Sequence, residues 1–150
     1  MKTKEIELGY VAMYCYTPKT DLNPEWQTPG HDHYIEGDEK KNVDEKEVVL
    51  QAGAYTLVID YPLETPFKKS FVVGVKGMTR RALVNLIVKS YKKVYADEDT
   101  AVGDPGHIPG MFNRQRSEGP YGIWGHDLGD LMLSCATVKR NGDIELEVDS

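Results

Sequence analysis

Apolar residues recur at steps of three and four between residues 79 and 95, the spacing that places side chains on one face of an α-helix. These positions are Leu83, Leu86, Ile87, Tyr91, Val94 and Tyr95. The polar positions expected on the opposite face are Arg81, Asn85, Lys89, Lys92 and Lys93. Thr79 can cap the first turn, because its hydroxyl can accept from an amide that has no partner within the helix. The pattern predicts one amphipathic helix over 79–95.

Apolar or alternating runs predict strands at 6–16, 48–50, 55–61 and 70–75. The first run is apolar on both faces, which is typical of a central strand or one covered on both sides. The last is expected to be buried and to lead through a glycine turn at Gly77 into the helix.

Two further runs, 131–138 and 144–148, flank the pair Asn141–Gly142. Asn-Gly between two strand patterns is the strongest short signal for a β-hairpin. In the second run Ile144, Leu146 and Val148 are predicted to face inward, and Glu145 and Glu147 outward. The chain is therefore expected to hold a C-terminal β-hairpin.

Proline and glycine mark two long irregular segments, 17–47 and 97–122. A chain of 150 residues fits one domain with one core. Strands alternating with a single strong helix predict an α+β fold, a mostly antiparallel sheet packed against one main helix. We therefore expect a single α+β domain over residues 1–150.

The formal net charge of −6 hides an uneven distribution along the chain. Residues 65–96 hold eight basic residues and no acid, so that segment carries +8 and the remainder −14. A basic face of this kind attracts nucleic acid or an acidic protein. The alternative, favoured because 24 acids are available, is that acidic segments such as 32–47 neutralise it within the chain or across a dimer.

The start of the helix is the candidate anion site within this basic segment. A glycine turn followed by a helix N-terminus presents free amides, and arginines can add paired donors. The candidate anion-binding residues are Lys76, Thr79, Arg80, Arg81, Lys89, Lys92 and Lys93. Neither the spacing of a P-loop nor that of a dinucleotide fingerprint occurs.

His31 and His33, with Glu36 close behind, are candidate metal ligands. Histidines two apart on an extended strand point to the same side, and a carboxylate can complete a site. The spacing is similar to the cupin metal motif, but the glutamate comes one residue early and no second motif follows. His107 is a candidate fourth ligand. The alternative, a solvated turn, is favoured.

His126 and Asp130 are candidate catalytic residues in the glycine-rich stretch 119–131. If a short helical turn begins near Asp127, the two side chains come close and can act as acid/base partners or as ligands. The favoured alternative is structural: Asp127 caps the turn, and His126 bonds a backbone group to fix a corner ahead of the hairpin.

The stretch Tyr121–Leu131, read as Tyr-Gly-Ile-Trp-Gly-His-Asp-Leu-Gly-Asp-Leu, resembles small uncharacterised proteins of large DNA viruses, the marseillevirus-like group in particular. The resemblance implies a viral, intracellular protein that is packaged in the virion and forms a dimer. It implies no catalytic or ligand residue.

Cys15 and Cys135 lie in apolar runs and are expected to be core thiols rather than a disulfide. The chain shows no signal-peptide pattern and no apolar stretch near the roughly 20 residues that cross a bilayer. We therefore expect an intracellular protein, in the host cytoplasm or the virion, without membrane contact.

Two function classes remain open after these observations. The first is a non-enzymatic interaction or structural protein that self-associates as a homodimer and needs no cofactor. The alternative is a metal-dependent hydrolase, which would use histidines of the two irregular segments. The candidates for that role are His31, His33, His107, His126 and Asp130.

Overall fold

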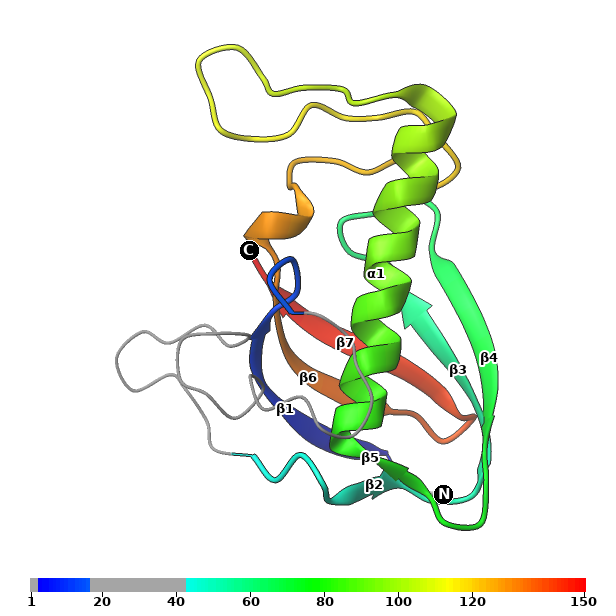
Figure 1. The fold of residues 1–150 in the computed structure, drawn as a ribbon. Coiled ribbons are helices and arrows are strands. Elements are labelled where there is room, and N and C mark those ends of the chain that lie inside the picture. Colours follow the sequence, from blue (N-terminus) through cyan, green and yellow to red (C-terminus); the bar gives the residue numbers. More distant parts are fainter. Residues whose placement is uncertain (1–2, 17–42) are drawn as a thin grey trace.

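The structure is a computed structural model, and it describes residues 3–16 and 43–150. Five strands form the main sheet in the order β1-β6-β7-β3-β4. They are β1 (Lys4–Ala12), β6 (Met132–Val138), β7 (Asp143–Asp149), β3 (Gly53–Ile59) and β4 (Phe67–Val73). Neighbours run antiparallel except β3 and β7, which are parallel. The helix α1 (Arg80–Val102) lies across one face of this sheet (Figure 1), so the predicted α+β fold is confirmed.

A small second sheet and a short helix complete the described fold. The strands β2 (Val48–Leu50) and β5 (Met78–Thr79) pair in a second sheet at the start of the helix. A short 3-10 helix, η2 (Leu128–Asp130), precedes β6. Within the described ranges no helix, α1 included, has both the length and the apolar character needed to cross a membrane.

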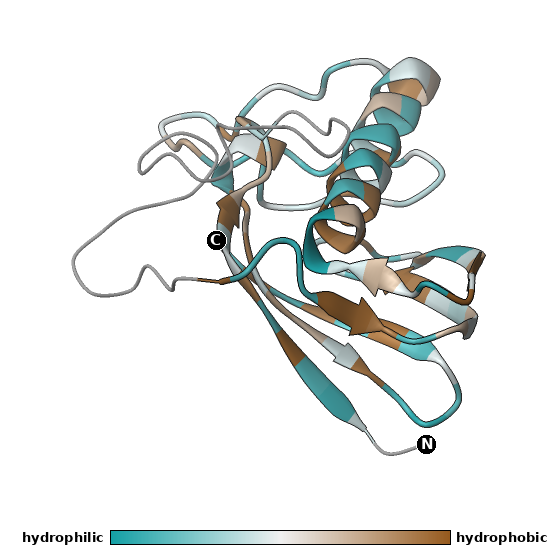
Figure 2. Cartoon of the chain, turned by 60° about the horizontal axis from the view of Figure 1, so that its bottom comes forward, coloured by the Kyte–Doolittle hydropathy of each residue, from teal (hydrophilic) through white to brown (hydrophobic). Residues whose placement is uncertain are grey.

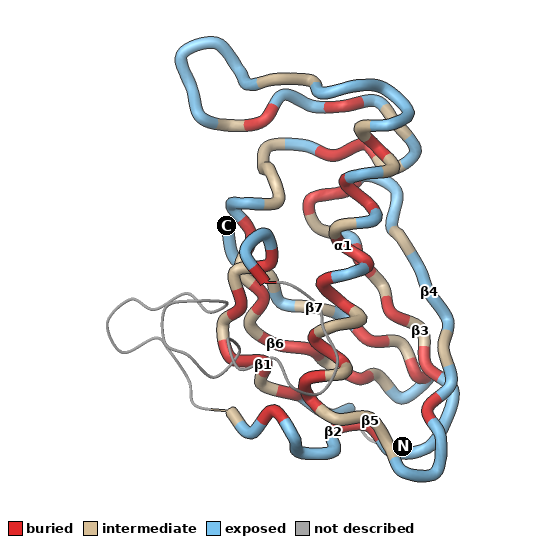
Figure 3. Tube along the Cα trace, in the orientation of Figure 1, coloured by how far each residue is buried: buried red, intermediate tan, exposed pale blue. Residues whose placement is uncertain are grey.

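The core lies between α1 and the sheet, where Figure 3 shows the buried positions of the chain. Ile87 of the helix and Leu57, Leu133 and Ile144 of the sheet are fully buried. Apolar and polar positions alternate around α1 in Figure 2, as an amphipathic helix requires. The predicted apolar face is confirmed in the main, although Leu86 is only partly buried.

The helix begins where the sequence predicts and ends later. The Thr79 side chain accepts a hydrogen bond from the Ala82 amide at 3.2 Å, so the predicted cap is present. The helix then continues about two turns beyond residue 95 to Val102. The predicted loop start at residue 97 is wrong, because residues 97–102 continue the helix. In this last part Asp97 pairs with Lys93, and Glu98 and Asp99 bind Ser117 and Arg114. Gly103, at φ 78°, ends the helix.

Two predicted strands differ from the observed ones. The first strand ends at Ala12, and residues 13–15 form a turn. The strand predicted at 70–75 is β4, and it is mostly exposed rather than buried. Its position explains the difference, since β4 is the outermost strand of the sheet and β3 is its one partner among the described strands. Val72 on this strand is 80% exposed.

The predicted C-terminal hairpin is confirmed, with β6 and β7 paired antiparallel around Asn141–Gly142. Gly142 has φ 92°, and a Cβ at this position would lie 2.8 Å from the carbonyl oxygen of Ala54. Only glycine fits such a close approach. Ile144 is buried, and Glu145 and Glu147 are exposed on the other face.

Candidate functional site

Residues 103–131 follow α1 and lie beside its C-terminal end (Figure 1). Glu98, in the last turns of α1, is a fully buried carboxylate that contacts this segment. Its oxygens accept hydrogen bonds from the Ser117 hydroxyl and from the amides of Gly119, Tyr121 and Ile123. Burial alone would raise the pKa of the Glu98 carboxyl, but these hydrogen bonds hold it below its usual value. A Cβ on Gly119 would lie 2.5 Å from Glu98. Glu98 therefore fixes the course of this loop.

A second buried charge, Arg114, ties the same loop to the helix. Its side chain, 4% exposed, contacts Asp99 at 2.8 Å and Asp127 at 3.4 Å. The guanidinium also lies 5.4 Å from the centre of the Tyr95 ring. Burial opposes the charged form, but the two carboxylates raise the pKa of Arg114. The loop is thus held at two points by buried ionic groups.

Two histidine–carboxylate pairs lie around this anchored loop. His107 Nε2 is 2.7 Å from Asp127, and His126 Nδ1 is 3.6 Å from Asp130. Asp127 and Asp130 also form a capping box at the start of η2. The structure therefore brings the predicted pair His126 and Asp130 together, and it places Asp127 in the capping role of the structural alternative.

A surface pocket of about 270 Å³ lies beside the second pair. It is lined by Phe112, Asn113, His126, Asp130 and Ser150. The hydroxyl of Ser150 is hydrogen-bonded to that of Tyr61 at 2.8 Å. A histidine beside a carboxylate can move a proton in this pocket. Neither Ser134 nor Cys135, which follow in the sequence, lines it.

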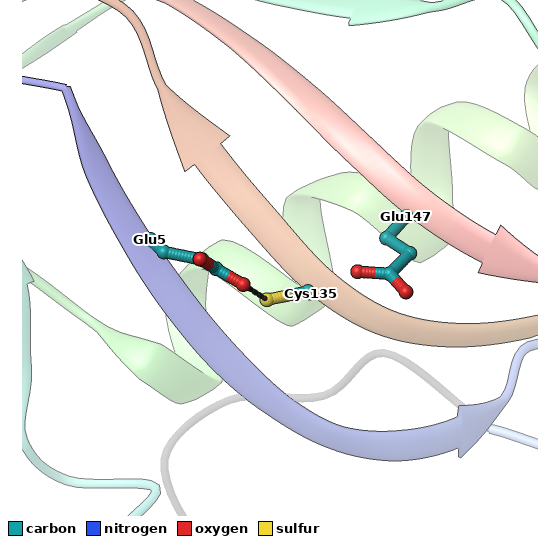
Figure 4. A group of neighbouring side chains, drawn as sticks. All are labelled: Glu5, Cys135 and Glu147. Atoms are coloured by element: carbon teal, nitrogen blue, oxygen red, sulfur yellow. Dashed lines mark hydrogen bonds between the residues drawn. The ribbon is translucent and has the colours of Figure 1, made fainter.

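One group of side chains among residues 3–16 and 43–150 places three possible metal-binding atoms close together. Glu5, Cys135 and Glu147 come from β1, β6 and β7, and their donor atoms lie within 4.8 Å of one another (Figure 4). Burial, the hydrogen bond to Glu5 and the nearby carboxylates raise the pKa of the Cys135 thiol to about 12. A cation here would first have to displace the thiol proton.

Of the predicted metal ligands, the structure describes His107 alone, and His107 is not part of this group. His31, His33 and Glu36 lie outside the described residues. His107 contacts Asp127 and belongs to the other end of the fold. Sequence spacing gives no sign of the Glu5–Cys135–Glu147 group, because its members lie on three strands and meet only through the register of the sheet.

The two arginines at the start of α1 are used within the chain. Arg80 donates to the Glu7 carbonyl at 2.7 Å and contacts the Glu47 carboxylate at 3.0 Å. Arg81 forms an ion pair with Glu45, and both side chains are buried. Arg81 was expected on the solvent face of the helix, and that prediction is wrong, because residues 44–47 fold over this end of α1.

The remaining candidate anion-binding residues are distributed between internal contacts and solvent. Lys92 donates to the Tyr16 carbonyl at 2.6 Å, and Lys93 pairs with Asp97 at 2.9 Å. The hydroxyl of Thr79 caps the helix. Lys76 and Lys89 are exposed. Fewer basic side chains of the helix are therefore available to an anion than the number of basic residues in the sequence indicates.

Comparison of the chain with protein-family models, with curated proteins and with solved structures gave no match. The resemblance of residues 121–131 to the marseillevirus-like proteins therefore stays a prediction.

Proposed function

We propose that this chain is a non-enzymatic interaction protein that associates with a second copy through residues 108–112 and the adjoining pocket. The observation that carries the proposal is the position of Phe112. Phe112 is 98% exposed and is one of the residues that line the 270 Å³ pocket. An aromatic ring so exposed is a candidate contact with another protein, because burying it removes a large apolar surface from water.

The loop tip, residues 108–112, presents further apolar surface in a fixed shape. Ile108 and Met111 are also exposed. Hydrogen bonds brace the tip from Ile108 N to the Asn113 carbonyl and from Met111 N to the Ile108 carbonyl, both at 2.9 Å. The buried Arg114 anchors its base. A braced tip loses little conformational entropy on binding, which favours association.

A second copy is the partner that this surface fits. Phe112 and the pocket are neighbours on one surface, so a two-fold axis beside them would let each copy insert its ring into the other's pocket. The pocket is large enough, since a cavity of about 150 Å³ holds a benzene molecule. The homodimer expected from the sequence would form in this way, and the viral setting implied by residues 121–131 is proposed along with it.

Sedimentation velocity of the wild type and of Phe112→Ser over a range of concentrations tests the proposal. The wild type should dimerise, and the variant should weaken the dimer at least about tenfold, because its anchor is lost. Val75→Ser is the matched control, since Val75 is 96% exposed on another part of the chain. A wild type that stays monomeric at every concentration, or equal weakening by the control, would contradict the proposal.

The alternative class, a metal-dependent hydrolase, is supported by one observation, the His126–Asp130 pair in the pocket. Metal analysis of protein purified without a histidine tag distinguishes the two classes. Stoichiometric zinc, iron or manganese that is lost in His126→Ala but kept in Phe112→Ser would favour the hydrolase. Dimerisation that survives His126→Ala in metal-free protein would favour the interaction protein.

A further inference from the structure

A second cavity, of about 320 Å³, lies at the end of the fold where β1 and β2 begin. The loop tip lies at the opposite end of α1 (Figure 1), so this cavity is separate from the proposed dimer surface. Its floor consists of the buried side chains of Val49, Leu50, Tyr55 and Val138. The volume falls at the lower end of the roughly 300–1,000 Å³ range of small-molecule sites.

The bend at Ala52 and the first residues of β3 keep the cavity open. Ala52, Gly53 and Ala54 have no side chain large enough to fill it, and all three line it. The Tyr55 hydroxyl donates to the Gln51 carbonyl at 2.8 Å and so fixes the shape of the bend. An apolar body of modest size can therefore enter without a rearrangement of the chain.

Among the described residues that line the cavity, Lys4 is the one charged group, and none carries a carboxylate. The Lys4 ammonium donates one hydrogen bond, to the Val49 carbonyl at 2.9 Å. An ammonium has three donors, so two remain for a ligand. Glu5, the next residue, accepts from the Cys135 thiol and does not line the cavity. The described lining of the cavity therefore carries a positive charge, although the chain as a whole has 24 acids and 18 basic residues. A positively charged lining favours an anion.

We propose that this cavity binds a small organic carboxylate that has an apolar body. The apolar part would occupy the floor formed by Leu50, Tyr55 and Val138, and the carboxylate would accept from Lys4 at the rim. A charge-assisted hydrogen bond of this kind is stronger than one between neutral groups. The proposal is independent of self-association.

Titration of the isotopically labelled chain with sodium benzoate, followed by NMR, tests the site. Benzyl alcohol is the matched probe, because it has the same ring and no charge. Benzoate should saturate shifts at residues 49–55 and 138 and bind about tenfold more tightly than the alcohol. Lys4→Gln should remove that preference, whereas Lys139→Gln should keep it, because Lys139 pairs with Glu145 and does not line the cavity.

Ala52→Leu provides a second variant that leaves Lys4 in place. Its larger side chain should fill the cavity and abolish binding of both probes. The proposal is overturned if benzoate produces no saturable shifts at these residues. It is also overturned if the two probes bind equally, or if Ala52→Leu binds benzoate as the wild type does.

Discussion

At the scale of single residues, Glu98 determines whether residues 117–123 can close over the end of α1. Four donors surround its carboxylate. Three of them, Ser117 Oγ and the amides of Gly119 and Ile123, bond Oε2, and the Tyr121 amide bonds Oε1. Glu98→Gln would replace one carboxylate oxygen with an NH₂ group, which cannot accept hydrogen bonds from these donors. We expect it to lower the free energy of unfolding by about 2–3 kcal/mol at pH 7, because hydrogen bonds to charged groups are strong.

The pH dependence of that loss follows from the lowered pKa of Glu98. A carboxyl whose folded pKa lies below its unfolded value stabilises the fold above the unfolded pKa, and this contribution disappears as pH falls through the folded pKa. The stability difference between wild type and Glu98→Gln should therefore shrink as pH falls below about 4. Urea unfolding at several pH values measures it. A difference that stays constant down to pH 2 would show that the charge of Glu98 is not what holds the loop.

The two cysteines should differ sharply in reactivity. Cys135 is buried, and its thiol pKa is raised to about 12, so almost no thiolate exists at neutral pH. Cys15 is exposed. In native protein at pH 7.5, iodoacetamide should modify Cys15 alone, and mass spectrometry after digestion identifies the site. Urea should make Cys135 react as well, and rapid modification of Cys135 without urea would contradict the geometry of β6.

At the scale of elements, α1 packs on the sheet through Ile87 more than through its neighbour Leu86. Ile87 is fully buried and Leu86 only partly. Ile87→Ala should cost about 2–5 kcal/mol, the range for buried aliphatic truncations, and Leu86→Ala less than half as much. Urea unfolding compares them directly. Equal losses would mean that the helix is rotated about its axis relative to the structure.

The start of α1 depends on an internal ion pair in addition to apolar packing. Arg81→Ala would leave the Glu45 carboxylate buried against the helix without this partner. Breaking a buried pair on one side costs about 3–5 kcal/mol. Lys89→Ala, an exposed change on the same helix, should stay within about 0.5 kcal/mol. If thermal unfolding gave the two variants the same stability, residues 44–47 would not close over α1.

At the scale of the whole molecule, local patterns predict the helix and the hairpin because each depends on spacing within one segment. The buried helix face that contains Ile87 and the hairpin turn at Asn141–Gly142 are predicted from such local spacing. Contacts between distant segments cannot be predicted from local patterns. The edge position of β4, the burial of Arg81 by residues 44–47 and the Arg114–Asp99 pair all depend on which segments meet in space.

The same limit applies to the candidate sites. His126 and Asp130 are four residues apart, so a single turn is enough to bring them together, and the sequence predicts it. The pocket beside them needs Phe112 and Ser150 from elsewhere in the chain. The cavity at Lys4 needs three separate segments. Its one sequence signal is the run of small residues at 52–54.

The internal use of basic residues leads to a last prediction, on binding of polyanions. Arg80 and Arg81 are paired with Glu47 and Glu45, so they are not open to a polyanion. The chain as a whole carries a formal net charge of −6. We therefore expect no binding of duplex DNA or heparin by the wild type at low salt, where counterion release would favour it most. Fluorescence anisotropy with labelled DNA, and a heparin titration, measure this.

The triple reversal Lys89→Glu, Lys92→Glu and Lys93→Glu separates the two roles of the helix face. Lys92 donates to the Tyr16 carbonyl and Lys93 pairs with Asp97, so their reversal should lower the free energy of unfolding through lost hydrogen bonds and new repulsion. The single change Lys89→Glu should be nearly neutral, because Lys89 is exposed. Salt-dependent binding of DNA by the wild type that disappears in the triple variant, with stability unchanged, would instead assign this face to an anionic partner.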